Sequence, residues 1–421
     1  PMDFTLSDRV IELRDRVRDF VDENVLPVEL EAFRALDDEV KPGVPYPAIL
    51  VEIRERAKAE GLWNLFMPDE RYGPGLSNWE YGLLCEEMGR SPAAAPMAFN
   101  CAAPDTGNME ILAEHGTEEQ KQRWLEPLLE GRIRSCFAMT EPEVSGSDPT
   151  LIRAKATRDG DEWVVEGHKW FTSGAVGADL CIAMVVTQPE GHPYARASMI
   201  CLPADTPGFN LVRPIPVMGH DGGPGHCEIR FEECRVPLSN LLGQEAMGFA
   251  VAQDRLGPGR IHHCMRAIGT AERAHEMMCR RANEREAFGG PLGDKQFVQE
   301  AIATSRMEID QARLLTMYAA WKMDTEGKRA ARQSISAIKI VAANMVMEVL
   351  DRAIQIHGSL GMTDDTPLAA LWRFSRMLRL ADGPDEVHKM VLARRELNRW
   401  AKRAEAEAEG TLEPRHAPRP I

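Results

Sequence analysis

The sequence lacks several patterns that would assign it to common protein classes. Its 9 cysteines show no C-x-x-C spacing, which argues against a zinc site or a disulfide framework and favours reduced thiols. No apolar run approaches the roughly 20 residues of a membrane span. The N-terminal stretch 3–8 is acidic and carries no apolar segment of the secretory type. No strand precedes a G-x-G-x-x-G motif, so a Rossmann site is not expected. We therefore expect a cytoplasmic protein without membrane segments.

Positive charge is also in short supply. Lys and Arg number 50 against 65 Asp and Glu, so the formal net charge is -15. That balance argues against binding to nucleic acid or to an anionic membrane. A polyanionic ligand would have to be bound locally, by arginines or by helix N-termini. At 421 residues the chain is long enough for two or three domains.

Three kinds of pattern follow one another along the chain. Residues 1–130 carry apolar side chains at helical spacing and predict an all-α domain. Residues 131–245 contain short β-rich runs between turn signals, which predict a compact β-barrel or sandwich. Residues 246–403 carry long apolar-striped helices and predict a four-helix bundle. Residues 404–421 are predicted to be a flexible tail. The fold class is therefore α+β and multidomain.

Individual elements can be placed within these segments. The β-rich runs are 163–165, 180–186, 198–202 and 227–231. The C-terminal helices are predicted at 249–284, 295–325, 330–356, 367–380 and 385–408. Between the last two, Gly383 and Pro384 force a break. A carboxylate at such a break, Asp382, can point into a cleft, although a lone acid at a turn is more often a cap or a solvated group.

Two loops in the β-rich part offer surfaces suited to a flat heterocycle. The first, 137–148, opens the β-domain with hydroxyls and free backbone N–H groups, and the second, 167–174, offers flat aromatic walls. Their polar and aromatic side chains are Thr140, Ser147, Trp170, Phe171 and Thr172. The residues alone leave a second interpretation open, in which both segments are hairpin loops with core aromatics.

Five ordered motifs resemble those of the acyl-CoA dehydrogenase family. They are Thr140-Glu141-Pro142 followed by Gly146-Ser147-Asp148, then Trp170-x-Thr172-x-Gly174, Arg285-x-x-Phe288-Gly289, Gln355-x-x-Gly358-Ser359 and the segment around Asp382. The resemblance covers essentially residues 5–400. The stretches 255–266 and 381–388 resemble one branch in particular. It comprises family members ten and eleven, which in animals are fused to a kinase-like domain, and their free-standing bacterial relatives.

This resemblance implies FAD as the cofactor. The flavin contacts would be Phe137, Met139, Thr140, Ser147, Trp170, Phe171 and Thr172. The family holds the adenine half of FAD with the neighbouring subunit, here through Arg285, Phe288, Gln296, Gln355, Gly358 and Ser359. Pro384 and Glu386 stand where the family has further cofactor contacts. The resemblance therefore also implies a homodimer or homotetramer, and electron transfer to an electron-transfer flavoprotein.

The same resemblance assigns Asp382 as the catalytic base. In the family, the base removes the proton α to the thioester carbonyl of an acyl-CoA while hydride leaves the β-carbon for flavin N5. The family usually has Glu here, and Asp is shorter by ~1.5 Å. Gly259 stands where some members carry the base instead, so no substitute acid is present there. Burial beside substrate and flavin is expected to raise the pKa of Asp382.

Substrate contacts are expected at Ser147, Arg260, His263 and Gly383. Ala381 and Gly257 stand where the family commonly has larger residues, which indicates a pocket wide enough for branched or γ-substituted acyl groups. The resemblance to the branch implies 4-hydroxy or 4-phospho acyl groups. Cations near the acyl γ-carbon would be Arg260, Arg266 and His263. No metal is expected, because the consecutive residues His262, His263 and Cys264 point in different directions on a helix. Two alternatives stay open: a flavin-dependent oxidase, and a catalytically silent flavoprotein with a binding role, for example in association with nucleic acid.

Overall fold

The computed structural model describes residues 5–219 and 225–411, and it begins with a helical domain. Its helices are α1 (Asp8–Phe20), α2 (Glu29–Glu39), α3 (Ala48–Ala59), α4 (Asn78–Gly89), α5 (Ala95–Ala98), α6 (Asp105–His115), α7 (Glu118–Gln120) and α8 (Glu126–Leu129). Hydroxyl side chains cap the starts of α1, α4 and α7. Ser77 and Glu80 form a capping box that starts α4. The predicted all-α character of this segment is confirmed.

The middle of the chain forms an 8-stranded sheet in the order β6-β7-β3-β2-β4-β5-β8, with β1 paired in parallel to β4. The strands are β1 (Ser135–Ala138), β2 (Lys155–Asp159), β3 (Glu162–Ser173), β4 (Leu180–Val186), β5 (Ala197–Pro203), β6 (Phe209–Ile215), β7 (His226–Pro237) and β8 (Leu241–Leu242). The four predicted β-rich runs lie in β3, β4, β5 and β7. The Asp105 carboxylate accepts hydrogen bonds from Ser135 N and Oγ, both at 2.7 Å, which ties β1 to α6.

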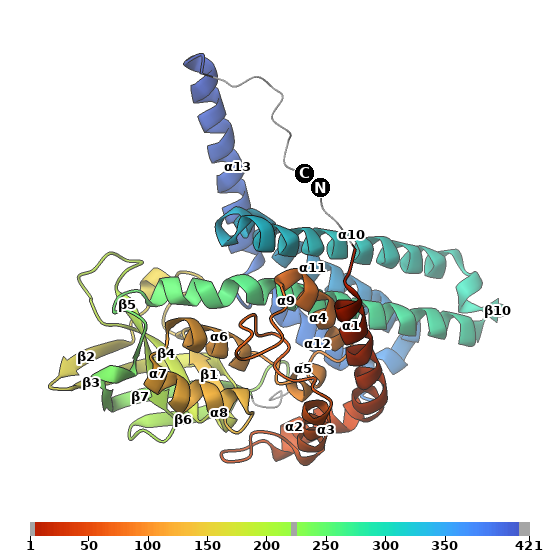
Figure 1. Cartoon of the computed structure of the whole chain (residues 1–421). Helices are drawn as coiled ribbons and strands as arrows, with labels where there is room; N and C mark the ends of the chain where they lie inside the picture. Colours follow the sequence, from red (N-terminus) through yellow and green to blue (C-terminus); the bar gives the residue numbers. More distant parts are fainter. Residues whose placement is uncertain (1–4, 220–224, 412–421) are drawn as a thin grey trace.

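The C-terminal part is a bundle of long helices. They are α9 (Gly248–Glu284), α10 (Gln296–Glu326), α11 (Lys328–His357), α12 (Leu368–Arg376) and α13 (Asp385–Ala408), with the hairpin β9 (Glu286–Ala287) and β10 (Gly290–Pro291) between α9 and α10. α9 runs from the sheet to this hairpin, and α13 projects from the body of the protein (Figure 1). The flexible tail was predicted to begin at 404, but α13 continues to Ala408. Residues 412–421 lie outside the described part.

One apolar core joins the three parts of the chain. Leu84 of α4, Met184 of β4 and Ile268 of α9 belong to the same buried cluster, while the other face of the sheet has a core of its own around Trp163. The segment Lys328–Met362 is long and apolar enough to cross a membrane by length and composition alone. Because 61% of its most apolar 18-residue stretch is buried inside the protein, the segment has the burial of a core helix of the bundle.

Candidate active site

Asp382 lies in the turn between α12 and α13. Its φ is 56° and that of Gly383 is 100°, so both residues are left-handed and the predicted helix break is confirmed. The Asp382 carbonyl oxygen accepts a hydrogen bond from Arg260 Nε at 3.1 Å and lies 3.2 Å from His388 Nε2. A Cβ on Gly383 would come within 2.9 Å of that same imidazole nitrogen. The backbone around the base is therefore fixed from both α9 and α13.

The Asp382 carboxylate is 26% exposed and has several ionisable neighbours. They are His263, Arg255, Arg260 and Lys339. Burial is the largest single influence and disfavours the charge, but these neighbours together outweigh it and hold the pKa of Asp382 below its ordinary value. The expected rise in this pKa depends on burial beside substrate and flavin and stays a prediction; in the protein alone the pKa is lowered. The carboxylate is ionised at neutral pH.

Two of the three cations predicted near the acyl γ-carbon need correction. His263 Nε2 lies 3.7 Å from Asp382 Oδ2, but burial lowers the pKa of His263 to about 4, so the imidazole is neutral at pH 7. Arg266 is buried and donates to Tyr81 Oη at 3.2 Å and to the Cys101 carbonyl at 2.9 Å. Arg266 therefore does not belong to the group around Asp382. Of the three, Arg260 alone contacts Asp382 as a cation.

The sequence interpretation missed the two other cations, Arg255 and Lys339. The Arg255 guanidinium lies over the Phe137 ring, 4.2 Å from its centroid, and its buried Nε has no hydrogen-bond partner. It links the flavin loop to the surroundings of the base. Lys339 is 3% exposed and donates to the Leu378 carbonyl. A signal was present, since Lys339 is the one charge in the apolar stretch 334–347.

The two predicted flavin loops lie together on the sheet. Trp170 N donates to the Thr140 carbonyl at 3.0 Å. The buried Lys169 ammonium donates to the Met139 and Met184 carbonyls and to Glu141 Oε1, at 2.8 to 2.9 Å. These bonds attach the loop after β1 to β3 and β4. Both loops thereby present their polar and aromatic groups from one rigid base.

Other flavin-loop residues differ in their burial. Thr172 is fully buried, and its Oγ1 has no hydrogen-bond partner among the described residues. Phe171 is 43% exposed and has a φ of 50°. Ser147, predicted to be near both flavin and substrate, is exposed, with its Oγ 2.8 Å from Ser145 Oγ. A buried hydroxyl without a partner costs free energy, so Thr172 has the character of a group that awaits a ligand.

The residues predicted to hold the adenine half of FAD lie in two other segments, and all are exposed in the single chain. Arg285, Phe288 and Gln296 lie at the hairpin between α9 and α10, whereas Gln355, Gly358 and Ser359 lie at the end of α11. Phe288 is 98% exposed. Pro384 and Glu386 flank the start of α13. An aromatic ring left wholly in solvent indicates a surface that another molecule covers.

These observations fit a flavin in the loops and a nucleotide at the hairpin. The loops offer an unpartnered buried hydroxyl, Thr172, beside the aromatic walls Trp170 and Phe171. The hairpin offers a free guanidinium fork, Arg285, for a pyrophosphate. FAD, when bound there, supplies the hydride acceptor.

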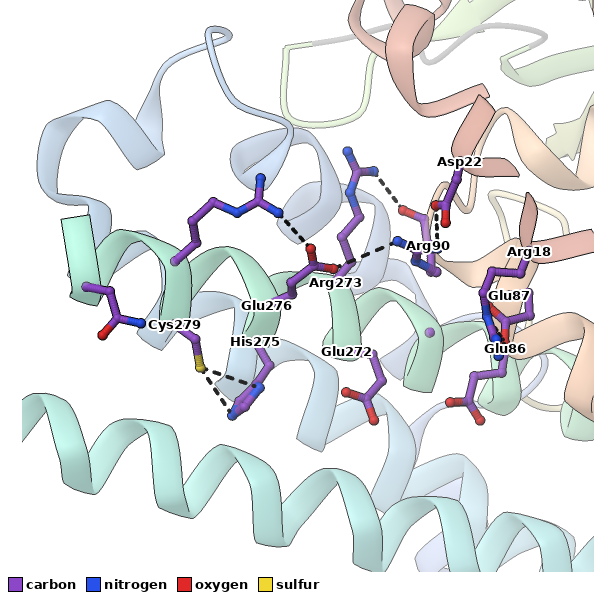
Figure 2. Close-up of a pocket in the computed structure, with 13 residues that line it drawn as sticks. Arg18, Asp22, Glu86, Glu87, Arg90, Glu272, Arg273, His275, Glu276 and Cys279 are labelled. Atoms are coloured by element: carbon purple, nitrogen blue, oxygen red, sulfur yellow. Dashed lines mark hydrogen bonds and ion pairs between the residues drawn. The ribbon is translucent and has the colours of Figure 1, made fainter. Parts of the chain in front are cut away.

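A cavity of about 700 Å³ between α1, α4 and α9 contains none of the predicted site residues (Figure 2). Its arginines pair with its carboxylates: Arg18 Nη2 lies 2.5 Å from Glu87 Oε1, and Arg280 Nη2 lies 2.9 Å from Glu276 Oε1. The cavity therefore lies at a charge-paired junction between helices.

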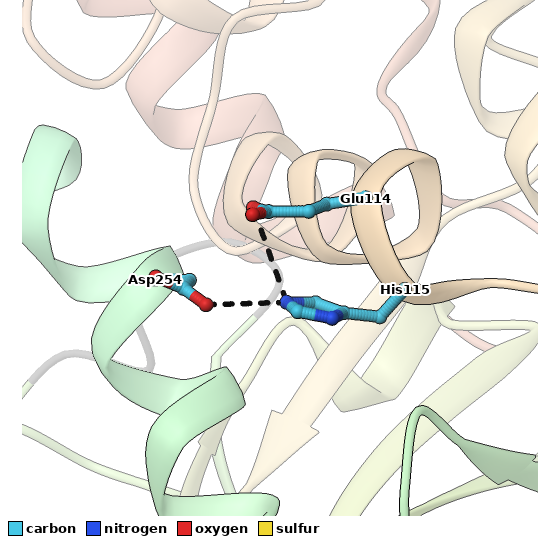
Figure 3. A group of neighbouring side chains, drawn as sticks. All are labelled: Glu114, His115 and Asp254. Atoms are coloured by element: carbon cyan, nitrogen blue, oxygen red, sulfur yellow. Dashed lines mark hydrogen bonds and ion pairs between the residues drawn. The ribbon is translucent and has the colours of Figure 1, made fainter.

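Glu114, His115 and Asp254 have ligand atoms within 4.8 Å of one another, close enough to hold a metal ion (Figure 3). His115 Nε2 lies 3.2 Å from Asp254 Oδ2, and Lys328 Nζ lies 3.0 Å from Asp254 Oδ1. The lysine already neutralises Asp254. The arrangement therefore favours a bridge between α6, α9 and α11 over a cation site.

The fold and the site together define a class of protein. Three family models match consecutive parts of the chain: the acyl-CoA dehydrogenase N-terminal domain over residues 7–132, the middle domain over 136–234 and the C-terminal domain over 246–397. The protein is therefore an oxidoreductase of the acyl-CoA dehydrogenase type. The chain belongs to the acyl-CoA dehydrogenase family, whose members are FAD flavoproteins.

Similar proteins place it within this family. The Mycobacterium tuberculosis protein named "Probable acyl-CoA dehydrogenase FadE2" is 50% identical over 404 residues, 94% of this chain and 98% of that protein. "Acyl-CoA dehydrogenase family member 10" of Mus musculus is 47% identical over 95% of this chain, which spans only 38% of that protein. A solved structure from Mycobacterium abscessus is 48% identical, has a TM-score of 0.90 and covers 94% of this chain and 100% of its own. The predicted branch is confirmed.

Proposed function

We propose that the protein catalyses FAD-dependent α,β-dehydrogenation of an acyl-CoA thioester, with Asp382 as the base. The observation that carries this proposal is the ionised, partly exposed carboxylate in a left-handed turn, joined through Arg255 to the flavin loop at Phe137. Asp382 takes the proton from the α-carbon. Thr172 orients the flavin ring, and Trp170 and Phe171 exclude water from its edge.

The positive charge around Asp382 suggests the kind of acyl group. Within residues 5–219 and 225–411, no salt bridge joins Arg255, Arg260 or Lys339 to a carboxylate, and all three favour the ionised form of Asp382 through their charge. A substrate with an anionic γ-substituent, such as a 4-phosphoacyl-CoA, would pair with these cations. The cations would then stabilise the ionised Asp382 carboxylate less, and the pKa of Asp382 would rise toward the value that a general base needs. The substrate would thus activate its own base.

The exposed segments support a proposed assembly of several subunits. Phe288 at the hairpin and Leu397 on α13 are 98% and 70% exposed, and such large apolar groups favour burial in a homodimer or homotetramer. Within it, Arg285 and Gln355 of one subunit would bind the adenine half of the FAD held by the other. An electron-transfer flavoprotein would receive electrons near the exposed Phe171. The cytoplasm is the proposed location.

The test is the anaerobic visible spectrum of the purified flavoprotein, recorded before and after addition of a panel of acyl-CoAs. The panel includes plain, branched, 4-hydroxy and 4-phospho thioesters. Bleaching of the flavin band by one class, with loss of bleaching in Asp382→Asn while flavin stays bound, is the expected result. A bound flavin that no thioester reduces would refute the proposal. Equal reduction by plain and 4-phospho thioesters would refute only the anionic γ-substituent.

A further inference from the structure

A second cavity, of about 780 Å³, lies between α4, α6, α9 and the turn that joins α10 to α11. Its wall is apolar in part, with Phe66, Leu76 and Met323. Two polar residues of the lining are nearly inaccessible to solvent: Tyr81 is 1% exposed and His262 is 7% exposed. None of the predicted site residues lines it.

The polar groups at the buried end of this cavity lack full hydrogen bonding. His262 Nε2 is buried and has no hydrogen-bond partner in the described part of the chain, and its ring meets Tyr81 edge-on, with 4.6 Å between centroids. Tyr81 Oη accepts from Arg266, and its hydroxyl also meets the buried thiols of Cys85 and Cys101, so Tyr81 closes the end of the cavity behind the His262 ring. Glu110 also lines the cavity, and burial raises its pKa to about 8. At pH 7 these three groups are uncharged, because burial also lowers the pKa of His262 far below its usual range.

The outer part of the cavity does not offer a free positive charge. Arg71 pairs with Asp69 at 2.6 Å, and Lys328 pairs with Asp254 at 3.0 Å. Lys121 pairs with Glu118 at 2.9 Å. Every cation of the lining thus has a carboxylate partner, so an anionic ligand end finds no counter-charge. A ligand end that both donates and accepts hydrogen bonds matches the buried groups.

The cavity and the base share helix α9. His263 faces Asp382 and His262 faces the cavity, and successive residues of a helix are about 100° apart. Gly259 precedes His262 and His263 by about one helical turn, and it lies on the side of α9 between the directions in which their side chains point. A Cβ on Gly259 would have nothing within 4 Å, so the surface of α9 is open at that point. This open point of α9 therefore lies between the His263 and His262 directions.

We propose that this cavity binds the far end of the acyl chain and selects an end with an uncharged hydrogen-bonding group, such as a hydroxyl. The inference rests on the proposed dehydrogenation and adds the chemistry of the chain end to it. Glu110 and His262 are the specificity-determining residues, and Tyr81 supports the His262 ring. A plain hydrocarbon end would leave their polar groups buried and unpaired, which is the basis of strong discrimination.

The experiment compares ω-hydroxyacyl-CoAs of increasing length with plain, ω-carboxy and ω-amino thioesters of the same lengths, by kcat/KM in a dye-linked assay. Beyond the length that reaches the cavity, kcat/KM for the ω-hydroxy chain should exceed that for the plain chain about tenfold. Calorimetric titration of the wild-type flavoprotein with the matching 2-enoyl-CoA products should show the same preference without turnover. Equal values for ω-hydroxy and plain chains at every length, or a preference for a charged end, would overturn the inference.

Matched variants locate the preference. Glu110→Met and His262→Phe should abolish the preference for ω-hydroxy chains. Glu110→Gln, whose amide still donates and accepts hydrogen bonds, should retain this preference. Glu276→Gln, on the part of α9 that lines the other cavity, is the control and should leave it unchanged. If plain acyl-CoAs reduce the flavin but the ω-hydroxy preference is missing, only this inference fails. If no acyl-CoA reduces the flavin, the proposed function fails and the inference falls with it.

Discussion

Replacing Lys169 with Met tests the argument that a buried ion pair holds the flavin loop. The Lys169 ammonium is 0% exposed and Glu141 is 2% exposed, and their charged atoms lie 2.8 Å apart. Lys169→Met removes the ammonium and its three hydrogen bonds, and it leaves the carboxylate buried without a counter-charge. Such a loss lowers the free energy of unfolding by about 3–5 kcal/mol. We expect a drop of that size.

The assay is urea unfolding combined with hydrogen exchange of the peptide that carries 137–148. Glu141 also accepts the backbone N–H groups of Arg153 and Ala154, at 2.8 and 2.9 Å, so Lys169→Met should increase exchange in this loop as well as lower global stability. FAD affinity should fall with it, because Thr140 lies beside Glu141. The surface pair Lys155–Glu166, at 3.0 Å on the same sheet, provides the control. Lys155→Met should cost about 1 kcal/mol or less.

A double variant separates the charge from the packing. In Lys169→Met with Glu141→Gln, no buried charge is left and the amide oxygen still accepts a backbone N–H. The double variant should therefore recover about 2 kcal/mol relative to Lys169→Met alone. A loss below about 1 kcal/mol in Lys169→Met, or no recovery in the double variant, would refute the reasoning.

Three further changes have definite expected results. Burial lowers the pKa of His388 from 6.5 to about 4, so between these pH values the unfolded chain binds a proton that the folded chain does not. The free energy of unfolding should therefore fall by about 3 kcal/mol as the pH drops from 6.5 to 4. His388→Gln should flatten this pH dependence, measured by urea unfolding at a series of pH values. Thr172→Val should leave the thermal stability of the apoprotein unchanged or slightly raised, because the hydroxyl has no partner among the described residues. The same variant should bind FAD about tenfold more weakly in a titration. An unchanged FAD affinity would contradict a flavin contact. Phe288→Ser should shift the assembly toward smaller species in light scattering while each chain stays folded, and an unchanged mass would count against this surface as an interface.

Sequence patterns predicted the fold well where they are local. The helix break at Gly383 and Pro384 follows from backbone chemistry, and the long apolar stripes placed α9, α10 and α11 to within a few residues. Four strands of the sheet were not singled out: β1, β2, β6 and β8. β8 has only two residues, and the outward-facing β6 is mostly accessible, so neither carries a strong hydrophobic signal.

The electrostatics of the site could not be predicted in the same way. Arg255 and Lys339 approach Asp382 from helices that lie far away in the sequence, and no local pattern reveals that convergence. The charge of His263 was predicted wrongly for a related reason. A histidine within 3.7 Å of a carboxylate would ordinarily gain a proton, but burial and neighbouring cations outweigh that attraction. The identity of the base came from motif resemblance, whereas its charge state came from packing.

The turn itself explains why the base can be an aspartate. A left-handed residue pays a steric penalty of roughly 1–2 kcal/mol unless it is Gly, Asn or Asp, whose short polar side chains tolerate this region. Asp382 has a φ of 56°, and its carbonyl is held by Arg260 and near His388, so the backbone cannot relax into another conformation. A glutamate at this position would carry the penalty, whereas aspartate avoids it. The shorter side chain is therefore matched to a backbone fixed by α9 and α13, and the difference from the usual family residue is consistent with a working base.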